Sequence, residues 1–147
     1  MSTGKRFIRG VLTVLGALLL VVANSTAPAS AATRQGTCES GEVCFYFYAG
    51  SQGSLSDFTG SLDNYGATQP SCYEFKTPQM SGYGQCMKNN ARSVRNLTGK
   101  AVRVYFNSGY CGSYDTIPAN SAHDLSVAYD NNASHQFSPY PVGCHSV

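Results

Sequence analysis

Six cysteines are the residues of this sequence whose chemistry is easiest to define: Cys38, Cys44, Cys72, Cys86, Cys111 and Cys144. Cysteines form disulfides or bind metals such as zinc, and their spacing helps to decide between the two. No two of them form a Cys-x-x-Cys pair, and the three histidines are scattered along the chain. The pattern therefore favours three disulfides over a zinc site, and it indicates an oxidising, extracellular destination.

Motifs typical of enzymes are missing from the sequence. It contains no His-Glu-x-x-His, no Gly-x-Ser-x-Gly and no Walker-type loop. His123 stands next to Asp124, but adjacent side chains of an extended chain point apart, so the pair does not suit acid-base catalysis. We expect His135 and His145 to lie at the surface. Since paired cysteines also leave no thiol nucleophile, we predict that the protein is not an enzyme, requires no cofactor and acts by binding.

The N-terminal stretch is typical of a cleaved secretory signal. Three basic residues precede an apolar run at 11–23, and Ala29-Ser30-Ala31 offers small residues for cleavage, which places the signal at 1–32. The run is shorter than the ~20 residues that suit a membrane span. No second hydrophobic stretch follows. We therefore expect a secreted protein without a membrane anchor.

The segment 33–147 is long enough for one small domain. The full chain has ten Lys and Arg and eight Asp and Glu, but three of the basic residues stand at positions 5, 6 and 9 of the signal, so seven (10 − 3) remain against the eight acidic ones. This near balance argues against a nucleic-acid partner. We expect a single monomeric domain.

Alternation of apolar and polar residues predicts strands and little helix. Val102, Val104 and Phe106 alternate with other residues at the period of a strand with one buried face, and the segment around Phe45 and Phe47 does the same. The turn sequence LTGK (97–100) separates two strand-like segments, which predicts a hairpin between them. Only residues 121–128 offer a short helical turn.

Two phrases of the sequence repeat. YFYAGSQG (46–53) matches YFNSGYCG (105–112) at both ends, and NNARS (89–93) is echoed by DNNAS (130–134) at a smaller offset. The difference requires an insertion in the first half, at about 65–87. Repeats of this length suggest two copies of one supersecondary unit, and two Greek keys packed as a sandwich, at about 41–96 and 101–144, would bury both hydrophobic faces.

The insertion also bears on the disulfide pairing. Six cysteines allow several pairings, and sequence alone does not choose among them. A cross-link within an inserted loop would act as a local staple, which favours Cys72 with Cys86. Cys38 with Cys44 would close a short loop around Gly41, and Cys111 with Cys144 is then left.

The spacing of Tyr105, Tyr110 and Gly112 resembles the Greek-key motif of the βγ-crystallin fold, in which an aromatic ring covers a glycine in a folded hairpin. Tyr46 and Gly53 match the motif in the first copy, where Ser51 replaces the second aromatic residue. The opening CESGEVCFY and the phrase ARSVRNLTG are similar to the secreted bacterial peptidase inhibitors of this fold. The resemblance implies an all-β, disulfide-stabilised sandwich of two Greek keys.

The same resemblance raises the question of calcium. Domains of this fold often bind Ca²⁺ through paired stretches rich in Asn, Asp and Ser, and NNARSV and DNNASH match that form except at the final serine. Calcium prefers oxygen ligands. The resemblance implies side-chain ligands from Asn90, Ser93, Asn131 and Ser134. The alternative is that these residues cap turns through side-chain hydrogen bonds to the backbone, and we weigh the two readings evenly.

Inhibition of an extracellular protease, a metalloprotease by analogy with the family, is the function that the resemblance implies. An inhibitor needs a stiff exposed loop with apolar anchors. Two segments are candidates: YEFKTPQMSGYGQ (73–85), with Phe75, Met80 and Tyr83, and the stretch from Tyr110 to Ile117. The alternatives are an antimicrobial module similar to killer-toxin-like βγ-crystallins, and a calcium-stabilised structural domain.

Overall fold

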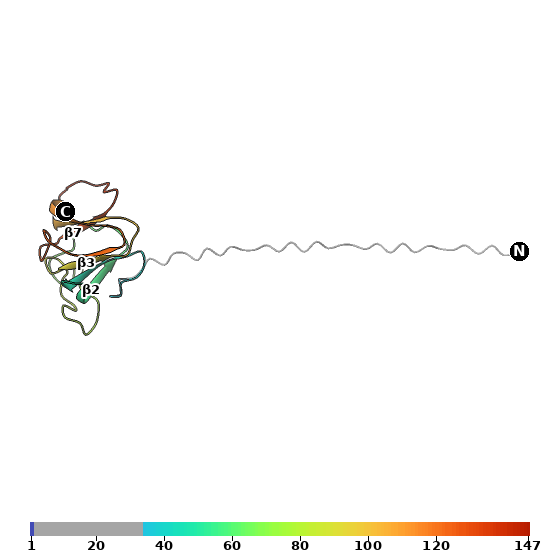
Figure 1. The fold of residues 1–147 in the computed structure, drawn as a ribbon, viewed down its shortest axis with the longest axis horizontal. Helices are drawn as coiled ribbons and strands as arrows, with labels where there is room; N and C mark the ends of the chain where they lie inside the picture. The colour runs from blue at the N-terminus through green and yellow to red at the C-terminus, as the bar shows by residue number, and fades with distance from the viewer. Residues whose placement is uncertain (2–33) are drawn as a thin grey trace.

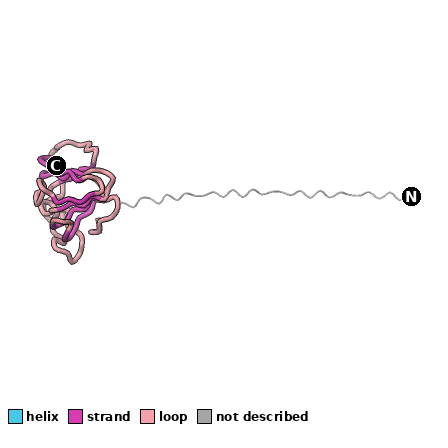
Figure 2. The backbone as a smooth tube through the Cα atoms, viewed as in Figure 1, coloured by secondary structure: helices cyan, strands magenta, loops and turns pink. Residues whose placement is uncertain are grey.

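The computed structural model describes Met1 and residues 34–147, so the predicted signal at 1–32 lies outside the described residues apart from Met1. In residues 34–147 the chain forms strands, loops and turns without a helix, as Figure 2 shows. No helix capable of crossing a membrane is therefore found in this part. The prediction of an all-β domain is confirmed.

The strands form two antiparallel sheets, which appear as two layers in Figure 1. The first sheet has the order β2-β1-β3-β6, and the second has the order β5-β4-β7. Their bounds are β1 Val43–Tyr48, β2 Gln52–Phe58, β3 Ser93–Asn96, β4 Val102–Asn107, β5 Cys111–Ile117, β6 Ser121–Asp124 and β7 Ser134–Phe137.

Alternating side chains of the central strands fill the space between the sheets. Val43 and Phe45 of β1 face Val102 and Val104 of β4, and all four are fully buried in one core cluster. His135 of β7 is also fully buried, among aromatic rings that include Phe45 at 5.0 Å between ring centroids. The expectation that His135 lies at the surface is wrong, because β7 turns this side chain toward the core.

The predicted repeat has a matching backbone geometry. Ser51 and Tyr110 occupy equivalent positions, with φ of 59° and 58°, and Gly53 and Gly112 follow with φ of 79° and 80°. Glycine tolerates these positive angles without the steric cost that other residues meet. Ser51 therefore adopts the conformation of Tyr110 although it lacks the aromatic ring. Each copy folds its first two strands over in the same way.

The third extended segment of each Greek key pairs with the sheet that the other key forms. We call this the exchange of third segments. β6 belongs to the second key but pairs with β3 of the first sheet, where Val94 lies opposite His123. In return, Leu62 of the first key forms an isolated bridge with His135 of the second sheet. Each sheet is thus completed by the other half of the chain.

The hairpin predicted across residues 97–100 does not form, because β3 and β4 lie in different sheets. The side chain of Asn96 is fully buried, and its hydrogen bonds hold the segment that passes from the first sheet to the second. Its amide nitrogen donates to the carbonyl oxygens of Lys100 (2.8 Å) and Pro118 (2.9 Å), and its amide oxygen accepts from Thr98. The segment is therefore a link between sheets. The helical turn predicted at 121–128 is also wrong, since its first half is strand β6.

Three disulfides join Cys38 to Cys44, Cys72 to Cys86 and Cys111 to Cys144, which are the pairs that the sequence favours. Among the described residues, no cysteine is free. The first and third bonds tie the two ends of the domain to strands β1 and β5. The second closes the insertion on itself.

Candidate functional site

The insertion ends in a narrow projecting segment, residues 74–85, which we call the clamped loop. Cys72 and Cys86 are joined at its base, and Glu74 pairs with Cys86 as an isolated bridge. Above the base, the backbone NH of Phe75 donates to Gln85 O and that of Gly84 donates to Phe75 O, both at 3.0 Å. The disulfide and these bonds hold the two arms of the loop together.

One arm of the clamped loop also runs along the edge strand β2. The backbone NH of Lys76 donates to Leu55 O at 2.7 Å, and the NH of Ser54 donates to Ser81 O at 2.9 Å. The hydroxyl groups of Ser54 and Thr77 add bonds in both directions between these segments. The loop thus lies along the edge of the first sheet, and these hydrogen bonds fix its position relative to the domain.

The tip of the loop is held by close packing. Gly82 lies against Phe47, and a Cβ atom at this position would collide with the ring of Phe47. The backbone NH of Tyr83 donates to Met80 O at 3.1 Å, which closes a turn at the tip. The loop is therefore fastened at its base by a covalent bond, along β2 by hydrogen bonds and at its tip by a turn and a packing contact.

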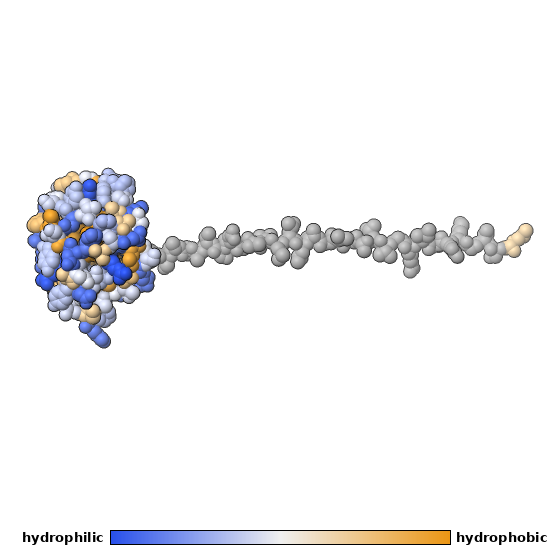
Figure 3. Space-filling view, in the orientation of Figure 1, coloured by the Kyte–Doolittle hydropathy of each residue, from blue (hydrophilic) through white to orange (hydrophobic). Residues whose placement is uncertain are grey.

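The exposed anchors of the loop are Met80, which is 46% exposed, and Tyr83, which is 56% exposed. Phe75 is fully buried, and its ring packs edge-on against Phe47 at 5.5 Å between centroids. The prediction that Phe75 contacts a partner is therefore wrong, because this side chain attaches the loop to the domain. Figure 3 shows one face of the domain, on which hydrophobic residues are scattered among polar ones.

The second candidate segment is not a loop. Residues from Cys111 to Ile117 form strand β5, which pairs with β4 along its length. Tyr110 precedes this strand and is half-buried between Tyr105, at 5.8 Å, and His145, at 5.5 Å between ring centroids. Burial raises the pKa of its hydroxyl. Tyr110 therefore belongs to the folded hairpin of the second Greek key, in the structural place that the resemblance implies.

The N-terminal end of the domain contacts the arm of the clamped loop that begins at Glu74. The sequence did not indicate this contact. The guanidinium of Arg34 lies over the rings of Phe58 (4.8 Å) and Tyr73 (4.7 Å) and donates to Glu74 O at 2.7 Å. Gly36 O accepts from the hydroxyl of Thr77 at 2.7 Å. Burial lowers the pKa of Arg34, although nearby Asp57 opposes this shift.

A carboxylate holds this N-terminal segment in place. Asp57 is buried, and its two oxygens accept from the backbone NH groups of Gln35 (3.1 Å) and Gly36 (2.9 Å). Glu74 also lies near Arg34, and hydrogen bonds from Lys76 and Gln69 lower the pKa of its carboxyl group. No local sequence pattern reveals this support, because its partners lie far apart in the chain.

The serines proposed as calcium ligands have symmetric roles in the two keys. The hydroxyl of Ser93 donates to Tyr48 O at 2.6 Å and accepts from the NH of Ser51 at 2.9 Å. The hydroxyl of Ser134 does the same with Asn107 O (2.6 Å) and Tyr110 NH (3.2 Å). Each serine thus fastens one folded hairpin.

The asparagines of the same stretches also bond to the backbone. Asn90 donates to Cys86 O at 2.9 Å, and Asn131 donates to Tyr129 O at 2.9 Å. The carboxylate of Asp130 is paired with Arg92. Within residues 34–147, no three His, Cys, Asp or Glu side chains are grouped to hold a metal. The donors are mostly neutral and already bonded, so they fit calcium poorly, and calcium binding stays a prediction.

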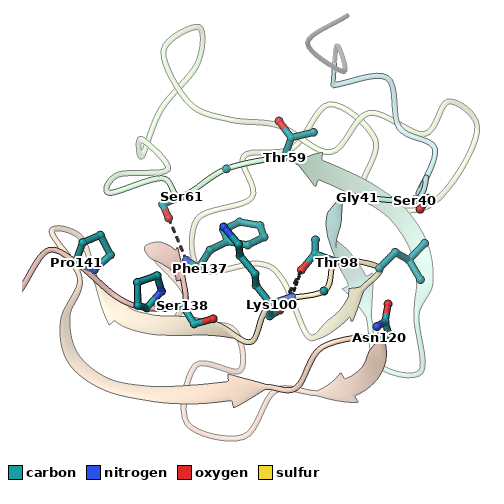
Figure 4. Close-up of a pocket in the computed structure, with 14 residues that line it drawn as sticks. Ser40, Gly41, Thr59, Ser61, Thr98, Lys100, Asn120, Phe137, Ser138 and Pro141 are labelled. Atoms are coloured by element: carbon teal, nitrogen blue, oxygen red, sulfur yellow. Dashed lines mark hydrogen bonds between the residues drawn. The ribbon is translucent and has the colours of Figure 1, made fainter. Parts of the chain in front are cut away.

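A groove of about 850 Å³ opens where the ends of both sheets meet, and Figure 4 shows its lining. In this view Pro141 and Ser138 lie toward one end of the groove, and Thr98 and Asn120 toward the other. The hydroxyl of Ser61 accepts from Phe137 NH at 3.0 Å and joins the first key to β7 at this point. The groove carries none of the residues that the sequence singled out for binding.

The comparisons with known proteins agree with this geometry. The sequence profile of peptidase inhibitor family I36 matches residues 31–117, which include the whole clamped loop. A solved structure described as "Evolution of the eye lens beta-gamma-crystallin domain fold" is similar with a TM-score of 0.50 and 14% identity, over 71% of this chain and 91% of that chain. No curated protein sequence matches the chain. The expected βγ-crystallin-like fold is confirmed, and the chain belongs to peptidase inhibitor family I36.

Proposed function

We propose that the protein inhibits an extracellular metalloprotease and that the clamped loop is the segment that enters the cleft of that enzyme. Membership of a peptidase inhibitor family supports inhibition. The observation that carries the assignment to this loop is the exposure of Met80 and Tyr83 on a segment that is fastened at its base, along β2 and at its tip. The metalloprotease is the target class that the sequence resemblance implies.

A stiff loop suits this role for an energetic reason. A flexible segment loses conformational entropy when it binds, at a cost of roughly 1–2 kcal/mol for each backbone residue that is ordered. The clamped loop is ordered before binding, so more of the energy from burying Met80 and Tyr83 contributes to affinity. The carbonyl oxygens of Met80, Ser81 and Gly82 already accept hydrogen bonds within the domain.

The cross-link also explains how such a loop resists a protease. A cut anywhere between Cys72 and Cys86 would leave both new ends attached to the domain through the disulfide. The bonds from Phe75 to Gln85 and from Lys76 to Leu55 would keep those ends in place. The cleaved form would therefore stay bound in the cleft, and rejoining of the peptide bond would compete with release.

Secretion is part of the same proposal. Three disulfides stabilise a small domain in an oxidising compartment, where they persist. A protein exported in this form would meet secreted proteases.

The proposal is tested by titrating the oxidised protein against a thermolysin-type, a subtilisin-type and a trypsin-type protease. We expect stoichiometric loss of activity in the first. The double variant M80A/Y83A should weaken inhibition by about tenfold or more, as loss of central anchors does at other interfaces. Tyr114 provides a matched control, because it is 42% exposed but lies on β5 of the other sheet. Full activity of all three enzymes would contradict the proposal and favour the antimicrobial or structural alternatives.

A further inference from the structure

A second exposed aromatic surface lies beside the clamped loop, centred on Arg92. The Cζ atom of Arg92 is 5.6 Å from the ring centroid of Tyr48, 5.7 Å from that of Tyr129 and 5.8 Å from that of Phe47. Tyr48 is 41% exposed and Tyr129 is 37% exposed, whereas Phe47 is half-buried beneath them. We call these four residues the Arg92 cluster.

The guanidinium of Arg92 is held in place before any partner arrives. Its Nε group donates to both carboxylate oxygens of Asp130 at 3.0 Å, and this bond raises the pKa of Arg92. Its backbone NH donates to Tyr46 O at 2.9 Å. A guanidinium has five N–H donors, and the contacts with Asp130 use only the one on Nε. The four donors on the two terminal nitrogens make no hydrogen bond within the described residues, so they are available to a partner.

The charge of the cluster is balanced internally. Asp130 neutralises Arg92, and the three aromatic side chains carry no charge. The surface therefore suits an uncharged partner surface that offers apolar groups and backbone carbonyl oxygens. Tyr and Arg are the residue types that contribute most often to binding energy at the centres of interfaces. Lost side-chain entropy is small here, because the rings and the guanidinium already restrain one another.

The Arg92 cluster is continuous with the clamped loop. A Cβ atom placed on Gly53 would lie 3.2 Å both from Ser81 O, in the loop, and from Cδ2 of Tyr48, in the cluster. Gly82 of the loop lies directly on Phe47. The ring of Phe47 is 4.9 Å from that of Tyr48 between centroids. Exposed surface thus extends from Met80 and Tyr83 to the cluster with Phe47 beneath it.

We propose that the Arg92 cluster is a second contact surface for the protease that the clamped loop engages, outside the active-site cleft of that enzyme. This inference rests on the proposed function. Continuity identifies the occupant, because an enzyme that takes up the tip of the loop comes close to Ser81 and Gly82, and these residues border the cluster at Gly53 and Phe47. The cluster adds affinity and selects among proteases whose clefts are alike but whose rims differ.

The test uses the intact, oxidised protein and whichever protease it inhibits in the titration above. Tyr129→Ala removes an exposed ring, and Arg92→Lys keeps the charge but removes the planar fork of donors. Each should raise the inhibition constant at least about fivefold. The increase should appear mainly in the dissociation rate. The size of this increase should be nearly the same at low and at moderate salt, because the cluster carries no net charge. Tyr114→Ala is the matched control.

The outcomes separate the two proposals. If the wild-type protein inhibits the protease and Tyr129→Ala has the same inhibition constant, the second contact surface is wrong and the proposed function stands. Absence of inhibition by the wild-type protein would overturn both. If the wild-type protein forms dimers that Tyr129→Ala dissociates, the cluster binds a second copy, and the inference is wrong. Should Arg92→Lys fail to fold, the exposed Tyr129→Ala still decides the result.

Discussion

The ring nitrogen Nδ1 of His135 lies 3.0 Å from the hydroxyl oxygen of Tyr65, in the core between the two sheets. Nε2 of the same ring lies 2.8 Å from Gly60 O, so Nε2 carries the hydrogen and donates a hydrogen bond to this carbonyl. The Tyr65 hydroxyl therefore donates to Nδ1, and His135 is neutral in the folded protein. Burial raises the pKa of Tyr65 well above its usual value, which keeps this donor protonated.

Acid should destabilise the protein through His135. Burial lowers its pKa from 6.5 to about 4. The unfolded chain takes up this proton as the pH falls below about 6.5, whereas the folded state resists until about pH 4. Stability is therefore unaffected by His135 above pH 6.5 and falls by up to about 3 kcal/mol between pH 6.5 and pH 4. Urea unfolding across this range measures the loss.

The matched variant for this prediction is His135→Phe, which suits the aromatic neighbours Phe45 and Phe58 but cannot titrate. Its stability should depend less on pH than that of the wild-type protein, by the amount given above. Equal slopes for wild type and His135→Phe would show that carboxylates alone cause acid unfolding.

Substitutions in the clamped loop should separate stability from binding. Phe75→Ala removes a fully buried ring and should cost about 3–5 kcal/mol of unfolding free energy. Met80→Ala removes an exposed side chain and should change stability by no more than about 0.5 kcal/mol. Thermal and urea unfolding give both values. A large loss of stability for Met80→Ala would show that Met80 packs against the domain, which would contradict its role as an exposed anchor.

The Cys72–Cys86 disulfide should protect the loop as well as stabilise the domain. Replacing both residues by serine frees a closed segment with a sequence separation of 14 and should cost about 3 kcal/mol. Limited proteolysis followed by mass spectrometry should then find cuts within residues 73–85 that the wild-type protein resists. The Cys38–Cys44 double serine variant is the control, since it leaves the loop closed. Identical cleavage patterns would show that hydrogen bonds alone hold the loop.

Ser93 and Ser134 should stabilise the fold whether or not calcium is present. Ser93→Ala leaves Tyr48 O and Ser51 NH without their partner and should cost about 1–3 kcal/mol, and Ser134→Ala should behave alike. The melting temperatures of the wild-type protein and both variants are compared in EDTA and in about 1 mM calcium. A loss of stability that appears only with calcium would show that the serines act as metal ligands instead.

Much of the fold follows from short-range patterns in the sequence. The repeated glycine of each key, at Gly53 and Gly112, needs a positive φ that few other residues accept, so its spacing marks the folded hairpin. The mismatch between the two repeats located the insertion, and the insertion in turn favoured the pairing of Cys72 with Cys86. These features depend on neighbouring residues, which makes them visible in one sequence.

The remaining features depend on contacts between distant residues. Phe75 and Tyr83 stand in one irregular segment without periodicity, so no pattern separates the buried ring from the exposed one. The expected hairpin at 97–100 failed because Asn96 bonds to Pro118, which lies in the second key. Arg34 contacts Glu74 across the fold, and composition alone gives no sign of this contact.

The exchange of third segments has a practical consequence. The family match ends at residue 117, before β6 and β7, yet β6 completes the sheet of the first half and β7 holds Leu62. Expression of residues 34–117 alone would leave β3 and β4 each with an unpaired edge, and such edges invite aggregation. Because each half completes the sheet of the other, truncating the chain or exchanging a single key for one from another protein would disrupt both sheets. A new loop sequence grafted between Cys72 and Cys86 would leave both sheets intact and would be held by the disulfide.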